Sequence, residues 1–316
     1  MIELAGIHHV TAITARIRDN HTFYTRTMGM RLVKKTVNQD DVSAYHLFYA
    51  DGKATPGTDF TFFDWPMQRE RRGTGCVWQT QFRVSGRSGV EWWENHLRTH
   101  GVHVSPMLQL GGRLTLEFED SEGQRLAIVD DEGVGLSWPW EKSPVPPEFQ
   151  IRGMGPLMLS VPDIKWTDEL LREALMLKPR RDYLRPGPKR HVVYVYDIGN
   201  GGAAREVHVA VQPDLPPAVQ GAGAVHHVAL RVHTFEQHDA WIERLTRLGI
   251  PNTGLVDRHY FRSVYFREPN GILFEIATDG PGFTVDEPEE QLGLKLSLPP
   301  FLEGRRAEIE ANLKPL

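Results

Sequence analysis

The stretch Val225-His226-His227-Val228-Ala229-Leu230 has a counterpart near the N-terminus, Gly6-Ile7-His8-His9-Val10-Thr11. Both are apolar segments of strand composition that place a histidine doublet before a valine. Successive side chains of a strand point to opposite faces, so only one histidine of each doublet faces a given cavity. Val228 and Leu230 share the face that would pack on a helix, which leaves His227 on the opposite face of its strand. By the same count, His9 shares a face with Thr11. We therefore expect His9 and His227 to face a cavity.

A carboxylate in the last predicted strand completes the pattern. In Leu273-Phe274-Glu275-Ile276-Ala277 the phenylalanine and isoleucine share the packing face, which leaves Glu275 on the cavity side. A carboxylate in an apolar strand is costly unless something pairs with it. Two histidines and one carboxylate form a facial triad, which leaves coordination positions open for substrate and oxygen. This pattern predicts His9, His227 and Glu275 as ligands of iron(II), with manganese(II) as the alternative.

Composition limits the class of protein. The 316 residues leave room for about two domains. A net charge of −5 with interspersed signs argues against a nucleic-acid partner. The single cysteine, Cys76, excludes an internal disulfide framework and suits a reducing compartment. Since no apolar run is long enough to span a membrane, we expect a cytoplasmic globular protein with no membrane partner.

The predicted elements follow one βαβββ order four times, which indicates repeated modules. Leu230-Arg231-Val232 matches Phe82-Arg83-Val84 at an offset of 148 residues, which sets Gln79 against His227 and Ala127 against Glu275. The second and third modules therefore lack metal-type residues, and modules 1 and 4 are predicted to share the metal site.

The expected fold class is α+β, with four βαβββ modules in two barrel-like domains. The expected boundaries are 1–66, 75–132, 151–213 and 223–282 for the modules, 133–150 for a proline-rich linker and 283–316 for a tail with a terminal helix over 301–313. Helices are predicted over 19–28, 89–100, 166–177 and 235–248. In modules 2, 3 and 4 the pattern identifies only two strands after the helix.

Four further sequence segments, spread over almost the whole chain, carry a resemblance to a known family: Phe23–Thr36, Gly57–Pro66, Asp257–Pro269 and Phe274–Phe283. With the strand-borne ligands, they resemble the vicinal oxygen chelate superfamily, and within it the dioxygenases that cleave hydroquinone and chlorohydroquinone rings. The resemblance implies the same three iron ligands. It also implies catalytic roles for a set of surrounding residues: Thr11, His226, Arg258 and Tyr265. Strand alternation points His226 away from the cavity, so a role for it requires a twist or bulge.

The resemblance implies an Fe(II)-dependent, extradiol-type dioxygenase that inserts O2 into a hydroquinone-type ring beside a hydroxyl. One alternative is a metal-dependent isomerase or lyase of the glyoxalase type, which is expected to need a fourth protein ligand. The strand that would supply it reads Phe60-Thr61-Phe62-Phe63 and offers no such ligand. The other alternative is a binding protein that sequesters an aromatic compound without a metal. The sequence leaves open the accepted ring substituents, the choice of His226 or Tyr265 as acid–base group, and a homo-oligomer.

Overall fold

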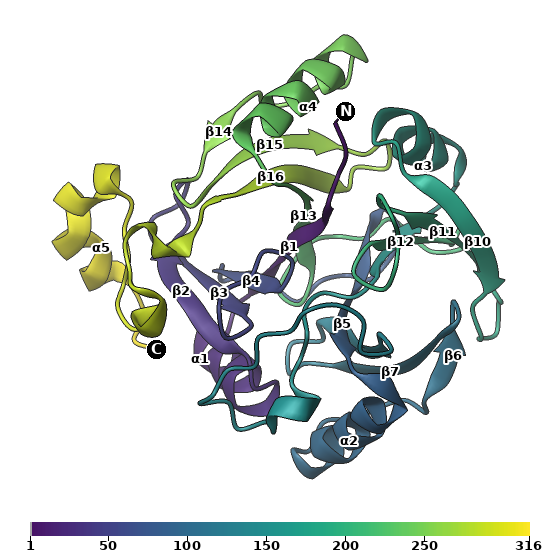
Figure 1. Ribbon diagram of the computed structural model, residues 1–316, viewed down its shortest axis with the longest axis horizontal. Helices are drawn as coiled ribbons and strands as arrows, with labels where there is room; N and C mark the ends of the chain where they lie inside the picture. Colours follow the sequence, from purple (N-terminus) through teal and green to yellow (C-terminus); the bar gives the residue numbers. More distant parts are fainter. Residues whose placement is uncertain (1) are drawn as a thin grey trace.

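The computed structural model of the chain describes residues 2–316. It contains two eight-stranded sheets, each curved, with the longer helices on their outer faces (Figure 1). The first sheet has the strand order β14-β15-β16-β13-β1-β4-β3-β2, and the second has the order β10-β11-β12-β9-β5-β8-β7-β6. The predicted α+β fold of tandem modules in two domains is confirmed.

The first sheet consists of β1 (Gly6–Thr14), β2 (Arg31–Val37), β3 (Tyr45–Ala50), β4 (Asp59–Asp64), β13 (Val225–Val232), β14 (Val256–Asp257), β15 (Phe261–Arg267) and β16 (Leu273–Pro281). The second consists of β5 (Cys76–Val84), β6 (Leu108–Leu110), β7 (Arg113–Glu119), β8 (Arg125–Asp130), β9 (Leu157–Val161), β10 (Lys178–Leu184), β11 (Val192–Asp197) and β12 (Glu206–Val211). The α-helices are α1 (Ile17–Thr22), α2 (Gly86–Thr99), α3 (Lys165–Glu169), α4 (Phe235–Arg247) and α5 (Arg306–Asn312).

The first and last quarters of the chain meet at the centre of the first sheet. There β1 pairs with β13 in antiparallel orientation, while β4 and β16 run parallel to β1 and β13 on either side. The two sheets use the same register, because Ala229 pairs with Glu275 in one and Gln81 with Ala127 in the other. The offset of 148 residues therefore holds in the strand pairing as well as in the sequence.

Three strands escaped prediction: β6, β10 and β14. Each supplies the third strand after the helix of its module and so completes the βαβββ order predicted for that module. The strand β14 has only two residues, and β10 carries several charges and lies largely exposed at a sheet edge. Neither segment shows the apolar alternation by which strands are recognised.

Two predicted helices are α-helical only in their first part. The helix predicted over 19–28 is α1 followed by a π-helical turn, Phe23–Thr27, and the helix predicted over 166–177 is α3 followed by Leu170–Ala174 of the same kind. Gly29, whose φ of +66° suits glycine, follows the end of the first helical segment, as predicted. The terminal helix predicted over 301–313 is a 3₁₀ segment, Pro300–Arg305, continued by α5.

The longer helices pack a tryptophan against each sheet. Trp93 of α2 and Trp241 of α4 are both fully buried in the main hydrophobic core. The helix α4 begins at a capping box in which the Thr234 side chain accepts the backbone N–H of Gln237. Within residues 2–316, no helix is both long and apolar enough to cross a lipid bilayer.

The C-terminal tail covers the edge of the first sheet beside β2 (Figure 1). The side chain of Lys34, on β2, is completely buried and donates hydrogen bonds to Glu287 and to Asp286, the latter at 2.6 Å. The backbone of Leu296 forms a bridge with Lys35. The tail thus protects an edge strand that would otherwise offer unpaired backbone groups.

Candidate metal centre

Three side chains from neighbouring strands converge at the centre of the first sheet: His9 of β1, His227 of β13 and Glu275 of β16. All three are buried. The two Nε2 atoms lie 3.3 Å apart, and Glu275 Oε2 lies 3.4 Å from the Nε2 of His9 and 3.0 Å from that of His227. Ligands about 2.1 Å from one ion are about 3.0 Å apart in an octahedron and about 3.4 Å apart in a tetrahedron. The triangle therefore has the size of a metal-binding face.

The carboxylate is oriented and left partly unsatisfied. Glu275 Oε1 accepts a hydrogen bond from Ser263 on β15, but Oε2 is buried and has no hydrogen-bond partner within residues 2–316. A buried oxygen without a partner is costly, and a cation facing the two imidazoles would satisfy it.

Both histidine doublets lie at β-bulges. In the pairing of β1 with β13, Ile7 faces Leu230 and His9 faces Ala229, so His8 is an extra residue. In the same pairing His226 is extra, because Thr11 faces His227 and Ala12 faces Val225. A bulge turns the extra side chain out of strict alternation. The bulge that a role for His226 would require is therefore present.

The bulged His8 determines which nitrogen of His9 is free. The Nε2–H of His8 donates to the backbone oxygen of Thr278 at 3.1 Å, and its Nδ1 lies 2.9 Å from Nδ1 of His9. Burial lowers the pKa of His8 to about 3, so the ring is neutral and its Nδ1 must accept. His9 then carries its proton on Nδ1, and the lone pair of its Nε2 points toward Glu275 and His227.

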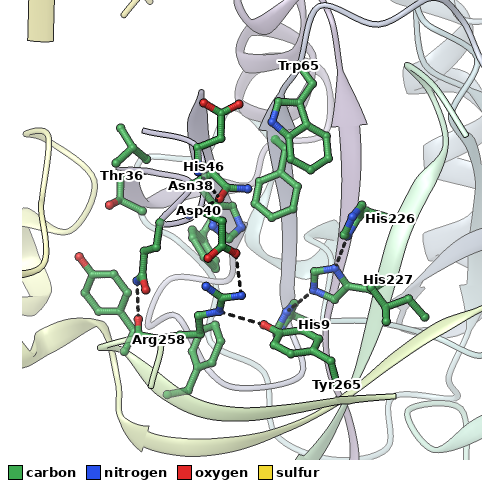
Figure 2. A pocket seen from close by; sticks show the side chains of 18 residues that line it. His9, Thr36, Asn38, Asp40, His46, Trp65, His226, His227, Arg258 and Tyr265 are labelled. Carbon is green, nitrogen blue, oxygen red and sulfur yellow. Dashed lines mark hydrogen bonds and ion pairs between the residues drawn. The ribbon is translucent and has the colours of Figure 1, made fainter. Parts of the chain in front are cut away.

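A matching contact exists at the second doublet, where Nδ1 of His226 lies 2.8 Å from Nδ1 of His227 (Figure 2). Burial also lowers the pKa of His226 to about 3. His226 packs edge-on against the rings of Phe63 and Trp65, with centroid distances of 5.4 Å to each, and lines the cavity. Its place beside the cavity differs from the expectation drawn from alternation, and the bulge accounts for the difference.

A cavity of about 280 Å³ opens onto the histidines. Its wall is rich in aromatic rings, which suits a flat apolar ligand. The lining side chains include Phe48, Phe63, Trp65, Tyr260, Phe261, Tyr265, His46 and Arg258.

Arg258 and Tyr265 form one unit at this wall (Figure 2). The Nε–H of Arg258 donates to the Tyr265 hydroxyl at 3.2 Å, and its Nη2 forms an ion pair with Asp40 at 2.9 Å. Burial and the Glu275 charge raise the pKa of Tyr265 above its usual value, so the phenol stays protonated. Because it accepts from Arg258, its own proton remains available for a molecule in the cavity.

Thr11, by contrast, is engaged with the sheet. Its hydroxyl accepts a hydrogen bond from Thr61 of β4 at 2.8 Å, and Nε2 of His46 lies 2.9 Å from the Thr61 oxygen. Sequence reasoning missed His46 and Ser263. A polar residue in an otherwise apolar strand, Tyr45–Ala50, was the available signal for His46.

The family model described as Glyoxalase/Bleomycin resistance protein/Dioxygenase superfamily matches residues 6–128 and 108–276. The chain belongs to this superfamily. A member from Bacillus subtilis, named "putative ring-cleaving dioxygenase MhqA", is 44% identical over the full length of both chains. The chlorohydroquinone/hydroquinone 1,2-dioxygenase of Sphingobium indicum is 32% identical over 96% of this chain and 94% of its own length. The predicted resemblance to ring-cleaving dioxygenases of the superfamily is confirmed.

Solved structures agree on the superfamily fold. A crystal structure of a "putative dioxygenase" from Bacillus subtilis aligns over all of this chain with a TM-score of 0.91 and 34% identity, and 98% of that chain is covered. Glyoxalase I from maize aligns over 87% of this chain and 92% of its own, with a TM-score of 0.62 and 14% identity. The second likeness concerns the fold alone.

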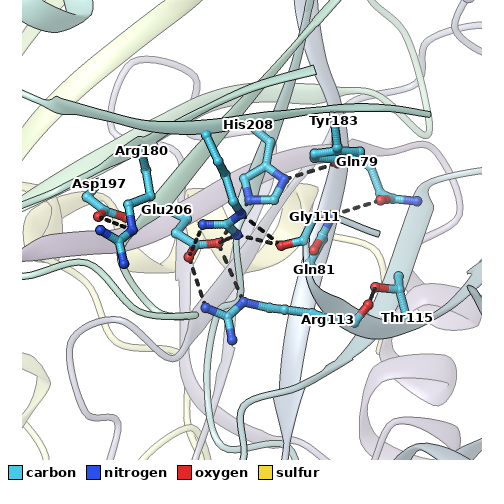
Figure 3. Close-up of polar contacts among 11 residues, drawn as sticks. Gln79, Gln81, Gly111, Arg113, Thr115, Arg180, Tyr183, Asp197, Glu206 and His208 are labelled. Carbon is cyan, nitrogen blue, oxygen red and sulfur yellow. Dashed lines mark hydrogen bonds and ion pairs between the residues drawn. The ribbon is translucent and has the colours of Figure 1, made fainter. Parts of the chain in front are cut away.

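The second sheet of this superfamily member has a different interior (Figure 3). Gln79, at the register of His227, donates to Glu117 at 2.7 Å rather than facing a second imidazole. Nearby, Glu206 forms ion pairs with Arg113 at 2.9 Å and Arg181 at 3.0 Å. Burial opposes ionisation, but hydrogen bonds from His208, Arg113 and Arg181 lower the pKa of Glu206. These groups satisfy one another, so the two sheets have different polar interiors despite a common fold.

Proposed function

We propose that the chain is an Fe(II)-dependent ring-cleaving dioxygenase that inserts O2 into a hydroquinone-type ring beside a hydroxyl, in an extradiol-type cleavage. The observation that carries the proposal is the convergence of His9, His227 and Glu275 on one buried point, with edges of 3.0 to 3.4 Å. The names of the full-length relatives support the reaction class and, for one of them, the hydroquinone substrate.

In this proposal the triad holds iron(II), or manganese(II) as the alternative. The bound ion would supply a redox-active Lewis acid at which a phenolic oxygen and O2 meet. The chain's own contribution is to fix the ligands and to shape a water-poor cavity. Ser263 holds the carboxylate, and His8 and His226 hold the imidazoles, as second partners of metal ligands commonly do.

The residues around the triad have distinct proposed tasks. Tyr265 donates its hydroxyl proton to an anionic oxygen in the cavity, and Arg258 stabilises that arrangement by a charge-assisted hydrogen bond. His226 lines the cavity and is the candidate that receives the phenolic proton when substrate binds. Thr11 supports the wall through Thr61.

The geometry gives the alternatives less support. An isomerase or lyase of the glyoxalase type is expected to use a fourth protein ligand from β4, and there the Thr61 hydroxyl is committed to Thr11 and His46. A binding protein for aromatic compounds would need the cavity but not the triad. The sequestering protein, which needs no metal, does not account for a buried carboxylate oxygen left unpaired between two imidazoles.

Oxygen uptake tests the proposal directly. Protein loaded anaerobically with Fe(II) should consume one O2 per hydroquinone and, with ¹⁸O2, incorporate label into a ring-opened acid. His9→Ala, His227→Ala and Glu275→Ala should each lose metal and turnover, whereas His233→Ala, at an exposed position, should retain both. Conversion without O2 uptake would support the isomerase, and binding of aromatic compounds without metal or turnover would support the sequestering protein.

A further inference from the structure

Arg258, a charged side chain at the cavity, is shared between Asp40 and Tyr265. Two histidines of the cavity wall have a hydrogen-bond partner on only one ring nitrogen within the described part of the chain. In His226 the paired nitrogen is Nδ1, which contacts the ligand candidate His227, and in His46 of β3 it is Nε2, which contacts Thr61. His46 therefore has a ring nitrogen available to a ligand without contacting the triad.

The orientation of the His46 ring is fixed by its neighbours. Its centroid lies 4.0 Å from that of Phe48 and 4.4 Å from that of Phe63, and Nε2 lies 2.9 Å from the Thr61 hydroxyl. Since Thr61 donates its proton to Thr11, its oxygen accepts the proton on Nε2 of His46. The nitrogen left to meet a ligand in the cavity is therefore Nδ1, which carries a lone pair.

The charge state of the ring agrees with this assignment. Burial, together with the nearby His9, His227 and Arg258, holds the pKa of His46 well below 6.5. A neutral imidazole with its proton on one nitrogen accepts a hydrogen bond on the other.

The second sheet provides an internal comparison. His46 pairs with Phe63, and at the matching register Val193 pairs with Ala210. The hydrogen-bonded series of His46, Thr61 and Thr11 is therefore not required to build such a sheet, because the second sheet has Val193 at the position of His46. Within the described residues, the series occurs only in the sheet that contains the triad.

A hydroquinone presents one hydroxyl to the triad and carries the other across the ring. That second hydroxyl is a donor, and a donor buried among aromatic side chains without an acceptor is costly. Building on the proposed function, we propose that Nδ1 of His46 accepts the hydrogen bond of the second, para hydroxyl. His46 is then a specificity-determining residue that favours rings with a donor para to the oxygen held at the triad.

Anaerobic binding to Fe(II)-loaded protein tests this inference, because no turnover is needed. Two ligands are compared: hydroquinone, and 4-methoxyphenol, whose para oxygen cannot donate. His46→Phe should weaken hydroquinone binding about tenfold, the loss of one hydrogen bond, and leave 4-methoxyphenol binding unchanged. His46→Gln keeps an acceptor and should recover most of the affinity. His233→Phe, a matched histidine replacement at an exposed position outside the cavity lining, should bind both ligands as the unmodified protein does.

Each outcome bears on the inference. A hydroquinone-specific loss in His46→Phe, with recovery in His46→Gln, supports it, provided thermal unfolding shows that both variants are folded. An equal loss for both ligands would mean that His46 only shapes the cavity, and no loss would mean that it makes no such contact. Either result overturns the inference while O2 uptake by the unmodified protein still upholds the proposed function. If the unmodified protein neither binds nor oxidises hydroquinone, both fail.

Discussion

Replacement of His8 tests whether this residue positions the proposed metal ligand His9 without contacting substrate. His8 does not line the main cavity, yet its two nitrogens connect Thr278 to His9. His8→Phe removes the acceptor that keeps the proton of His9 on Nδ1, so the imidazole can rotate or present the wrong tautomer. Loss of such a partner typically weakens metal binding 10- to 100-fold, about 1.4 to 2.7 kcal/mol.

The assay is competition with a chelator for Co(II) or Fe(II) under anaerobic conditions. Ile7→Val is the matched control, because it lies in the same strand, is buried and should cost about 0.5 to 1.5 kcal/mol of folding stability without touching an imidazole. His8→Phe should weaken metal binding and Ile7→Val should not. Unchanged metal affinity in His8→Phe would refute the tautomer argument. Equal losses of metal affinity in both variants would mean that the effect comes from general destabilisation of the fold.

Three further predictions concern the carboxylate, an acidic turn and the tail. Ser263→Ala should weaken metal binding 10- to 100-fold in the same assay by freeing the Glu275 carboxylate, while Ser263→Thr retains the hydroxyl and should not. Burial raises the pKa of Asp120 from 3.8 to about 6, so the folded state holds this proton more tightly and stability should fall as pH rises between those values. The fall is at most about 3 kcal/mol, and Asp120→Asn should abolish it in urea unfolding at a series of pH values. Lys34→Met should cost about 3 to 5 kcal/mol by leaving Glu287 buried without its cation, and adding Glu287→Gln should recover part; a cost below about 1 kcal/mol would contradict this.

Strand alternation and the internal repeat were sufficient to predict the fold and to select His9, His227 and Glu275 as a group that converges. Their role as metal ligands stays a prediction. The bulges at His8 and His226 could not be predicted, because an extra residue is defined only against a partner strand more than 200 residues away.

The interaction between His46 and Thr61 was missed for a related reason. It joins two strands through side chains, and neither residue belongs to a recognisable motif. The edge strand β10 was missed because its sequence is largely charged and exposed and does not alternate between apolar and polar residues. Sequence periodicity reports the faces of strands, whereas these features depend on which strands become neighbours.

The irregular pairing beside the histidine doublets also bears on how an ion would enter. In the second sheet Trp78 is the extra residue between Val77 and Gln79, at a place where no triad exists. Backbone pairing is therefore sufficient to produce this distortion without a metal. We therefore expect both imidazoles to be held in place before an ion binds, and the rate of metal uptake to be set by passage through the cavity mouth rather than by refolding of either strand.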